Sequence, residues 1–171
     1  MVMTDAHATD AADEEPAPRS LFERRIASEL RAMNEPFALL PHRPNYLLPL
    51  SYHRRAEGNG ADQRLEAEFQ LSFKFLLSRP LFEGRLMPFF SYTGRAWWQV
   101  YDGDRSRPFR EYNHEPELFF ALPLPPIELA GWTPRAAAFG FNHQSNGRSV
   151  PDSRSWNRLT GELLLDRGSS H

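Results

Sequence analysis

The stretch LEAEFQLSFKF, residues 65–75, decides the fold class, because its hydrophobic and polar residues alternate strictly. A period of two is that of a β-strand, in which successive side chains point to opposite faces. One face of this strand is hydrophobic throughout, and the other carries Glu, Gln, Ser and Lys. The pattern fits a β-sandwich above a core, or a barrel wall with lipid outside and a polar lumen inside. The period by itself leaves both open.

Similar patterns lie on either side of this stretch. The further predicted strands comprise residues 45–54, 86–101, 117–124, 135–145 and 155–165. The turn-rich segments between the strands comprise residues 57–60, 101–108, 123–126 and 146–154. The strands do not alternate with helices and show no repeat of fixed length. We therefore predict an all-β, antiparallel fold with about six strands joined as successive hairpins.

The N-terminal part differs in character. Residues 1–19 are rich in Ala, Asp and Glu and lack an apolar core, so they do not form a secretory signal sequence. We expect either disorder or a start codon placed inside a longer gene. Ser20 and Glu23 form a capping box, which predicts a short helix that ends near Pro36. Residues 20–171 would then form the β domain.

The composition narrows the class of protein. A formal net charge of -2 gives no reason to expect a nucleic-acid partner. The absence of cysteine excludes disulfides and thiolate metal sites. No run of about 18 apolar residues predicts a membrane-spanning helix, whereas a barrel strand needs only about 10 residues of alternating character.

The residues whose side chains could take part in catalysis lie in FNHQSNGRS, residues 141–149, and in SRSWNR, residues 153–158. On a strand, His143 and Ser145 share a face, with Cβ atoms roughly 6–7 Å apart. An imidazole within reach of a hydroxyl can take its proton and make serine a nucleophile. A third group must orient the base, and the hairpin after Ser145 brings Asn157 back beside it. A lone His–x–Ser spacing is common and usually inert, so the hypothesis depends on the whole stretch.

The alternation also assigns these residues to faces. His143 and Ser145 share a side with Phe141, and Asn157 shares one with Leu159. In a soluble sandwich the three polar side chains would be buried in the core. In a membrane barrel they would lie on the outer wall toward lipid, where an enzyme that cleaves lipids needs them.

The two segments resemble a known family, the outer-membrane phospholipase A of Gram-negative bacteria. HQSNGRS at 143–149 and SRSWNR at 153–158 carry the resemblance, which extends from about residue 32 to about residue 162. Other stretches that resemble the family are residues 34–46, SRPFRE at 106–111, Asn113, Glu115-Pro116 and GWT at 131–133.

The resemblance implies a transmembrane β-barrel of about twelve antiparallel strands in the outer membrane. It implies hydrolysis of the acyl esters of phospholipids, at either glycerol position, and of lysophospholipids. Ser145 would be the nucleophile, His143 the base and Asn157 the residue that orients the base.

The resemblance also implies that activity depends on calcium and on homodimer formation. The Arg148 carbonyl and the Ser153 hydroxyl would be calcium ligands from one protomer, and Ser106 would be the ligand from the other. Calcium prefers oxygen ligands, and a cation near the nucleophile would stabilise negative charge on the ester carbonyl. Serine is also common in turns for conformational reasons, and a loop arginine is ordinarily a solvated charge.

The sequence stops at His171, so we expect about six of the twelve family strands. Six strands cannot close a barrel in lipid, because an open edge leaves unpaired N–H and C=O groups. We therefore expect the 171-residue chain by itself not to form a stable, active enzyme. The alternatives to the enzyme are a truncated barrel fragment without a catalytic role and a soluble β-sandwich that binds a partner. Partitioning into detergent would distinguish the last two.

Overall fold

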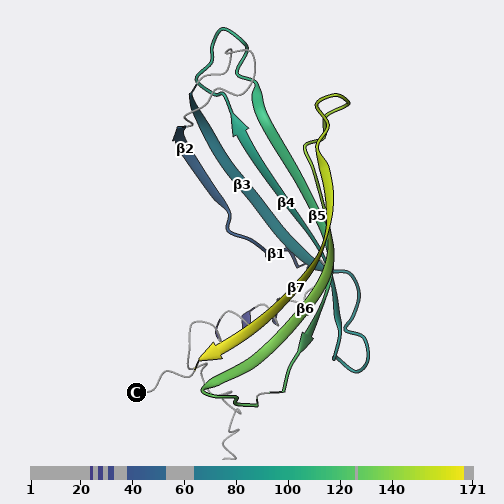
Figure 1. Ribbon diagram of the computed structural model, residues 1–171. Helices are drawn as coiled ribbons and strands as arrows, with labels where there is room; N and C mark the ends of the chain where they lie inside the picture. The colour runs from purple at the N-terminus through teal and green to yellow at the C-terminus, as the bar shows by residue number, and fades with distance from the viewer. Residues whose placement is uncertain are drawn as a thin grey trace, which may run out of the picture.

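The computed structural model describes residues 24, 27–28, 31–32, 38–52, 64–125 and 127–167 of the chain. The described residues form one antiparallel sheet of seven strands, which is strongly curved (Figure 1). The strands are β1 (Leu40–Pro41), β2 (Tyr46–Tyr52), β3 (Leu65–Leu76), β4 (Met87–Trp98), β5 (Phe109–Pro123), β6 (Trp132–Ser145) and β7 (Ser155–Arg167). From β3 to β7 each strand pairs with the next in the chain, and both β1 and β2 pair with β3.

The predicted fold class is confirmed, and each of the six predicted strands corresponds to one strand from β2 to β7. The additional strand, β1, has 2 residues and is too short to show a pattern in the sequence. β5 begins at Phe109, whereas the sequence predicted a strand from residue 117 onward. The difference arises at Pro116. This residue pairs with Tyr92 of β4, so the strand continues through it, but it lacks the N–H that a full ladder to β6 needs.

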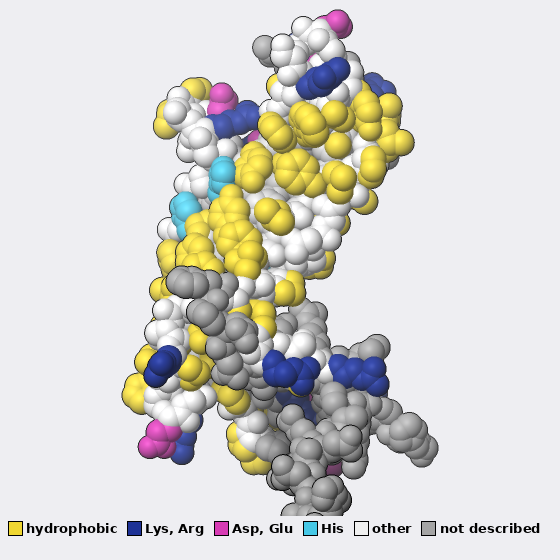
Figure 2. Space-filling model, turned by 180° about the vertical axis from the view of Figure 1, so that it is seen from behind, with side chains coloured by type: hydrophobic (Ala, Val, Ile, Leu, Met, Phe, Trp, Pro, Cys, Tyr) yellow, Lys and Arg dark blue, Asp and Glu magenta, His cyan; other side chains and the backbone are white. Residues whose placement is uncertain are grey.

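One face of the sheet is hydrophobic and exposed. Leu71 of β3 is 56% exposed, Phe141 of β6 is 48% exposed and Leu159 of β7 is 88% exposed. Figure 2 shows hydrophobic side chains in a broad band across this surface, with charged side chains mainly toward its two ends. A hydrophobic band between polar ends is the surface of a barrel wall in a membrane.

The other face is polar and holds its charges in pairs. Arg110 reaches Glu66 at 2.8 Å, and Arg43 reaches Glu115 at 3.0 Å. Burying a carboxylate is unfavourable unless a cation and hydrogen bonds compensate, which these arginines supply. A soluble sandwich would have the opposite arrangement, with its hydrophobic face covered by a second sheet. The described residues form a single sheet, so the sandwich alternative does not match.

Only part of the N-terminal region is described. Between Ser20 and Pro36, the described positions are 24, 27–28 and 31–32, and all have helical backbone, as the capping box predicted. The expected ends of this helix, the segment 1–19 and the turn at 57–60 lie outside the described residues. Within the described residues, no helix has the length and apolar character needed to cross a membrane.

Candidate active site on the hydrophobic face

The hairpin of β6 and β7 brings the three candidate residues together. Its register places His143 opposite Asn157 and Ser145 opposite Ser155. Residues opposite one another in an antiparallel pair share a face of the sheet. The side chains of His143, Ser145 and Asn157 therefore belong to the hydrophobic face, as the alternation predicted.

His143 and Asn157 form a direct hydrogen bond. The imidazole Nδ1 lies 2.7 Å from the amide Oδ1 of Asn157. An amide oxygen can only accept a hydrogen bond, so Nδ1 of His143 carries the hydrogen and donates it. The other ring nitrogen, Nε2, then keeps a free electron pair. This is the tautomer that a base needs in order to take a proton from a serine hydroxyl.

Ser145 is the last residue of β6, beside the loop that leads to β7. Its hydroxyl oxygen accepts a hydrogen bond of 3.1 Å from the backbone N–H of Gly147. Gly147 has a φ of 65°, a backbone conformation that residues other than glycine rarely adopt. Among the described residues, no hydrogen bond joins His143 to Ser145. The loop therefore presents an N–H group to the hydroxyl, while His143 lies two residues away on the same face.

Asn146 organises the loop, and sequence reasoning did not single it out. Its side-chain oxygen accepts the backbone N–H groups of Arg148, at 3.4 Å, and Arg154, at 2.9 Å. Its side-chain nitrogen donates to the Asp152 carbonyl at 2.9 Å. The side chain is almost completely buried, at 5% exposure. An asparagine before a glycine in a turn was the available signal, but its partners depend on the loop conformation.

The three predicted calcium ligands lie in two loops. Arg148 and Ser153 belong to the loop between β6 and β7, and Ser106 belongs to the loop between β4 and β5. Among the described residues, the Arg148 carbonyl accepts no hydrogen bond, and the Ser153 hydroxyl neither donates nor accepts one. Neutral oxygen donors of this kind fit calcium chemically. The described residues contain no group of three or more His, Asp or Glu that could hold a metal.

The loop that carries Ser106 is stabilised by Asp102. Burial of the Asp102 carboxylate opposes its ionisation, but hydrogen bonds from Arg105 outweigh this and hold the pKa of Asp102 below its usual value. Its backbone carbonyl also accepts the N–H of Arg107 at 2.9 Å. Ser106 itself has φ of 58°. The sequence predicted a turn-rich stretch at residues 101–108 but did not single out Asp102 as the residue that stabilises it.

A hydrogen-bonded cluster on the polar face stabilises the same hairpin from the opposite side of the sheet. The guanidinium of Arg158 donates to the side-chain oxygens of Glu115 at 2.6 Å, of Asn142 at 2.9 Å and of Gln144 at 2.9 Å. Asn142 and Gln144 flank His143 in β6, and Arg158 follows Asn157 in β7. This cluster therefore holds β5, β6 and β7 in the register that places His143 opposite Asn157. Sequence reasoning missed it, because its members come from three strands.

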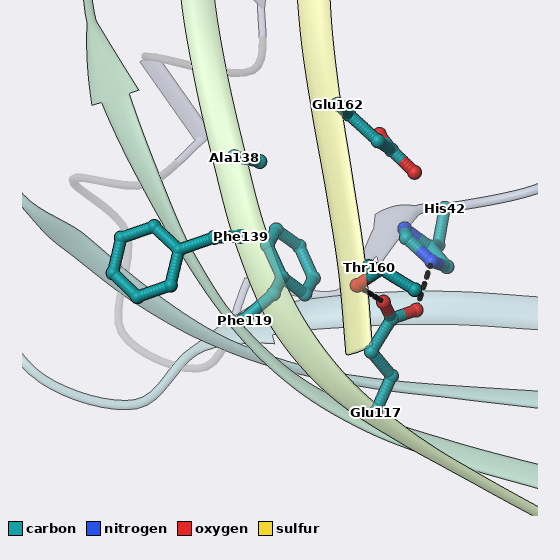
Figure 3. A pocket seen from close by; sticks show the side chains of 7 residues that line it. All are labelled: His42, Glu117, Phe119, Ala138, Phe139, Thr160 and Glu162. Atoms are coloured by element: carbon teal, nitrogen blue, oxygen red, sulfur yellow. Dashed lines mark hydrogen bonds and ion pairs between the residues drawn. The ribbon is translucent and has the colours of Figure 1, made fainter. Parts of the chain in front are cut away.

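A small pocket lies on the polar face, away from the candidate triad (Figure 3). Its centre is Glu117, whose carboxylate accepts the Thr160 hydroxyl at 2.8 Å and lies 3.4 Å from Nε2 of His42. The His42 ring stacks on Phe119, with ring centroids 5.4 Å apart. These contacts satisfy the buried carboxylate, and they connect β5 and β7 to the chain next to β1.

Comparisons with known proteins show the family of this chain. The family model described as Phospholipase A1 matches residues 22–171. A curated relative, "Phospholipase A1" of Proteus vulgaris, is 42% identical over 151 residues, which cover 84% of this chain and 52% of the relative. The chain thus spans about half the length of the curated relatives that it matches.

Two solved structures are similar. One is the outer membrane phospholipase dimer of Salmonella typhi with bound calcium, with a TM-score of 0.70 and 37% identity, over 81% of this chain and 57% of that one. The other is an active-site mutant of outer membrane phospholipase A from Escherichia coli, in which alanine replaces an asparagine. Its TM-score is 0.69 and its identity 36%, over 81% of this chain and 58% of that one.

Proposed function

Because this chain belongs to the phospholipase A1 family, we propose that the protein hydrolyses the acyl esters of phospholipids and lysophospholipids in the outer membrane. The observation that carries the proposal is the hydrogen bond from His143 to Asn157 on the hydrophobic face, beside Ser145. A base that is oriented in this way next to a hydroxyl is the arrangement of serine esterases. Its position on an exposed hydrophobic surface suits a substrate that is dissolved in a membrane.

The reaction is acyl transfer in two steps. The Ser145 hydroxyl oxygen attacks the ester carbonyl carbon while Nε2 of His143 takes the hydroxyl proton. The protonated His143 then gives this proton to the leaving alcohol oxygen of the lysophospholipid, and an acyl-enzyme remains. Water attacks the acyl-enzyme while His143 takes its proton, the bond between the acyl carbon and the Ser145 oxygen breaks, and His143 returns the proton to that oxygen as the fatty acid leaves. Asn157 keeps the ring in place and stabilises its protonated form through the amide dipole.

Negative charge develops on the ester carbonyl oxygen during each attack. The N–H of Gly147, which donates to the Ser145 hydroxyl in the free protein, is a candidate donor to this oxygen. A donor that is fixed before the reaction stabilises the transition state without a cost of reorganisation.

Calcium is the second source of charge stabilisation that we propose. The Arg148 carbonyl and the Ser153 hydroxyl would bind it in one protomer, and Ser106 would come from a second protomer of a homodimer. When bound, the cation would stabilise the negative charge that forms near Ser145. The buried Asn146 supports this proposal, because it holds the loop that carries Arg148 and Ser153. The calcium-bound dimer of the Salmonella typhi relative supports it as well.

The alternative is a fragment without a catalytic role. Among the described residues, β7, which carries Asn157, pairs on one edge only, with β6. An unpaired edge in lipid is unfavourable by several kcal/mol per exposed N–H or C=O group. The 171-residue chain and the full-length gene product, compared for calcium-dependent hydrolysis, would distinguish the alternatives.

The experiment that tests the function compares Ser145→Ala with wild type in the full-length protein. Fatty acid release from phosphatidylcholine in mixed micelles is measured with calcium present. Loss of the nucleophile should lower kcat by roughly 1000-fold or more. Ser155→Ala is the matched control, since Ser155 lies directly opposite Ser145 in the register and has no role in the mechanism. Equal rates for Ser145→Ala and wild type would remove Ser145 from the mechanism.

A further inference from the structure

A second imidazole stands beside Ser145, and the mechanism above does not use it. The register of β5 and β6 places His114 opposite Ser145. The Cβ atoms of such a pair are about 4.5–5.5 Å apart, no farther than those of His143 and Ser145. Ser145 therefore has one imidazole along its own strand and another on the neighbouring strand. Figure 2 shows histidine side chains next to the hydrophobic band.

Two tyrosines hold the His114 ring. The hydroxyl of Tyr92 lies 2.7 Å from Nδ1 of His114. The Tyr112 ring packs against the imidazole, with centroids 4.5 Å apart. Gly94 makes this packing possible, because a Cβ there would lie 2.6 Å from the Tyr112 hydroxyl oxygen. The imidazole is thus held in place by aromatic contacts on the hydrophobic face.

The opposite edge of the ring faces the loop at the nucleophile. A Cβ on Gly147 would lie 3.4 Å from both Cδ2 and Nε2 of His114. Gly147 is the residue whose backbone N–H donates to the Ser145 hydroxyl. The Nε2 edge of His114 and the Gly147 N–H therefore border the same space beside the nucleophile. An ester that reacts with Ser145 must place its carbonyl about 3 Å from the hydroxyl oxygen.

The partners of the two imidazoles allow them opposite chemistry. The Asn157 oxygen can only accept, so it leaves Nε2 of His143 without a hydrogen and ready to act as a base. A tyrosine hydroxyl can donate, and when Tyr92 donates to Nδ1 of His114, the hydrogen of that ring lies on Nε2. His114 then presents an N–H donor where His143 presents an acceptor.

We propose that His114 is a substrate-contacting residue, whose Nε2–H donates a hydrogen bond to the ester carbonyl oxygen at Ser145. This inference rests on the proposed function and adds a side-chain donor to the backbone N–H of Gly147. It also gives Tyr92 a task, because the tautomer of His114 with hydrogen on Nε2 requires the Tyr92 hydroxyl to donate to Nδ1. Donors at this position act on the transition state more than on the bound substrate, so kcat is the affected constant.

The test uses the full-length protein in mixed micelles, with rates normalised to the folded fraction. His114→Phe keeps a flat ring against Tyr112 but removes the donor, and we expect kcat to fall about 10- to 100-fold with KM little changed. His114→Gln keeps an N–H donor at a similar reach and should recover most of this loss. His42→Phe is the matched control, because His42 stacks on Phe119 on the polar face and should retain wild-type kcat.

Two substrates test whether His114 contacts the carbonyl or the phosphate of a phospholipid. A p-nitrophenyl acyl ester has the carbonyl but no phosphate, so a loss of kcat on both substrates supports the proposal. A loss on phosphatidylcholine only would overturn it, as would equal losses for His114→Phe and His114→Gln. Tyr92→Phe, which frees the tautomer, should lower kcat roughly two- to tenfold, and an unchanged kcat would also overturn it.

These outcomes are separate from a failure of the proposed function itself. If Ser145→Ala retains activity, the esterase mechanism is wrong. If Ser145→Ala is inactive while His114→Phe matches wild type on both substrates, only the role of His114 is wrong.

Discussion

The Nδ1 atom of His143 lies 2.7 Å from Oδ1 of Asn157, and the backbone register sets the two residues directly opposite one another in β6 and β7. The register of one hairpin thus decides whether Asn157 orients the His143 ring. A slip by one residue would turn Asn157 to the polar face, because side chains alternate along a strand. Features that hold this register should therefore affect catalysis as well as stability.

Removal of the Asn157 amide oxygen should impair the base. In Asn157→Ala nothing selects the tautomer of His143, and we expect kcat for phospholipid hydrolysis to fall about 100-fold with KM little changed. Asn157→Asp keeps an oxygen acceptor and should retain far more activity. Equal losses in the two variants, measured as fatty acid release, would show that acceptance of the Nδ1 hydrogen is unimportant.

Arg158 should affect activity from the polar face. Arg158→Met leaves the side chains of Glu115, Asn142 and Gln144 without its hydrogen bonds. Because Arg158 is 44% exposed, we expect a loss of only about 1–2 kcal/mol in the free energy of unfolding, together with a roughly tenfold lower kcat.

Arg135→Met provides the comparison for Arg158. Arg135 pairs with Asp166 at 2.9 Å and also connects β6 to β7, but at the end of the hairpin away from Ser145. This variant should lose stability in denaturant titration without the loss of kcat. If both variants lose activity to the same extent, the cluster around Arg158 has no special effect on the site.

Two glycines on adjacent strands should respond differently to alanine. A Cβ on Gly140 would lie 2.6 Å from Cβ of Phe119 and 2.8 Å from the Leu118 carbonyl oxygen, so backbone must move. Gly140→Ala should therefore lower the free energy of unfolding by about 1–3 kcal/mol. A Cβ on Gly161 meets nothing within 4 Å among the described residues, so Gly161→Ala should be neutral or slightly stabilising. A larger loss for Gly161→Ala in denaturant titration would contradict the packing described above.

Removal of calcium should reversibly stop the proposed hydrolysis of phospholipid. Chelation should abolish fatty acid release, and calcium should restore it. In Ser153→Ala the ion loses one oxygen ligand, so we expect half-maximal activity to need about 10-fold more calcium, with little change at saturation. Ser149→Ala, in the same loop, removes a hydroxyl that we do not assign to the ion and should leave the calcium dependence unchanged. Activity that persists in chelator would refute the calcium role.

The strands could be predicted because the alternation of hydrophobic and polar residues is visible within each segment. The alternation in residues 65–75 is visible without knowledge of any neighbour, and so is the common face of His143 and Ser145. The start of β5 was not predictable, since Pro116 reads as a break in the sequence but only interrupts the ladder on one side. A local pattern therefore defines a strand and its faces better than its ends.

The surroundings of the site were much harder to predict. His114 is 31 residues from Ser145 in the sequence, and it is placed opposite by the register of β5 on β6. Register depends on loop length and on packing across strands, which no single segment reveals. The same holds for Arg158, whose partner Glu115 is 43 residues away. Sequence reasoning therefore proposed the triad from one hairpin, but it did not predict contacts that depend on the register of a neighbouring strand, such as those of His114 and Arg158.

The most direct test of the central claim is covalent labelling of the full-length protein by an alkyl fluorophosphonate, with the modified residue located by mass spectrometry. If Ser145 is a nucleophile that His143 activates on the hydrophobic face, the label should be found on Ser145. Labelling should then be at least about 100-fold slower in His143→Ala. Labelling at another serine, or an equal rate in His143→Ala, would contradict the account.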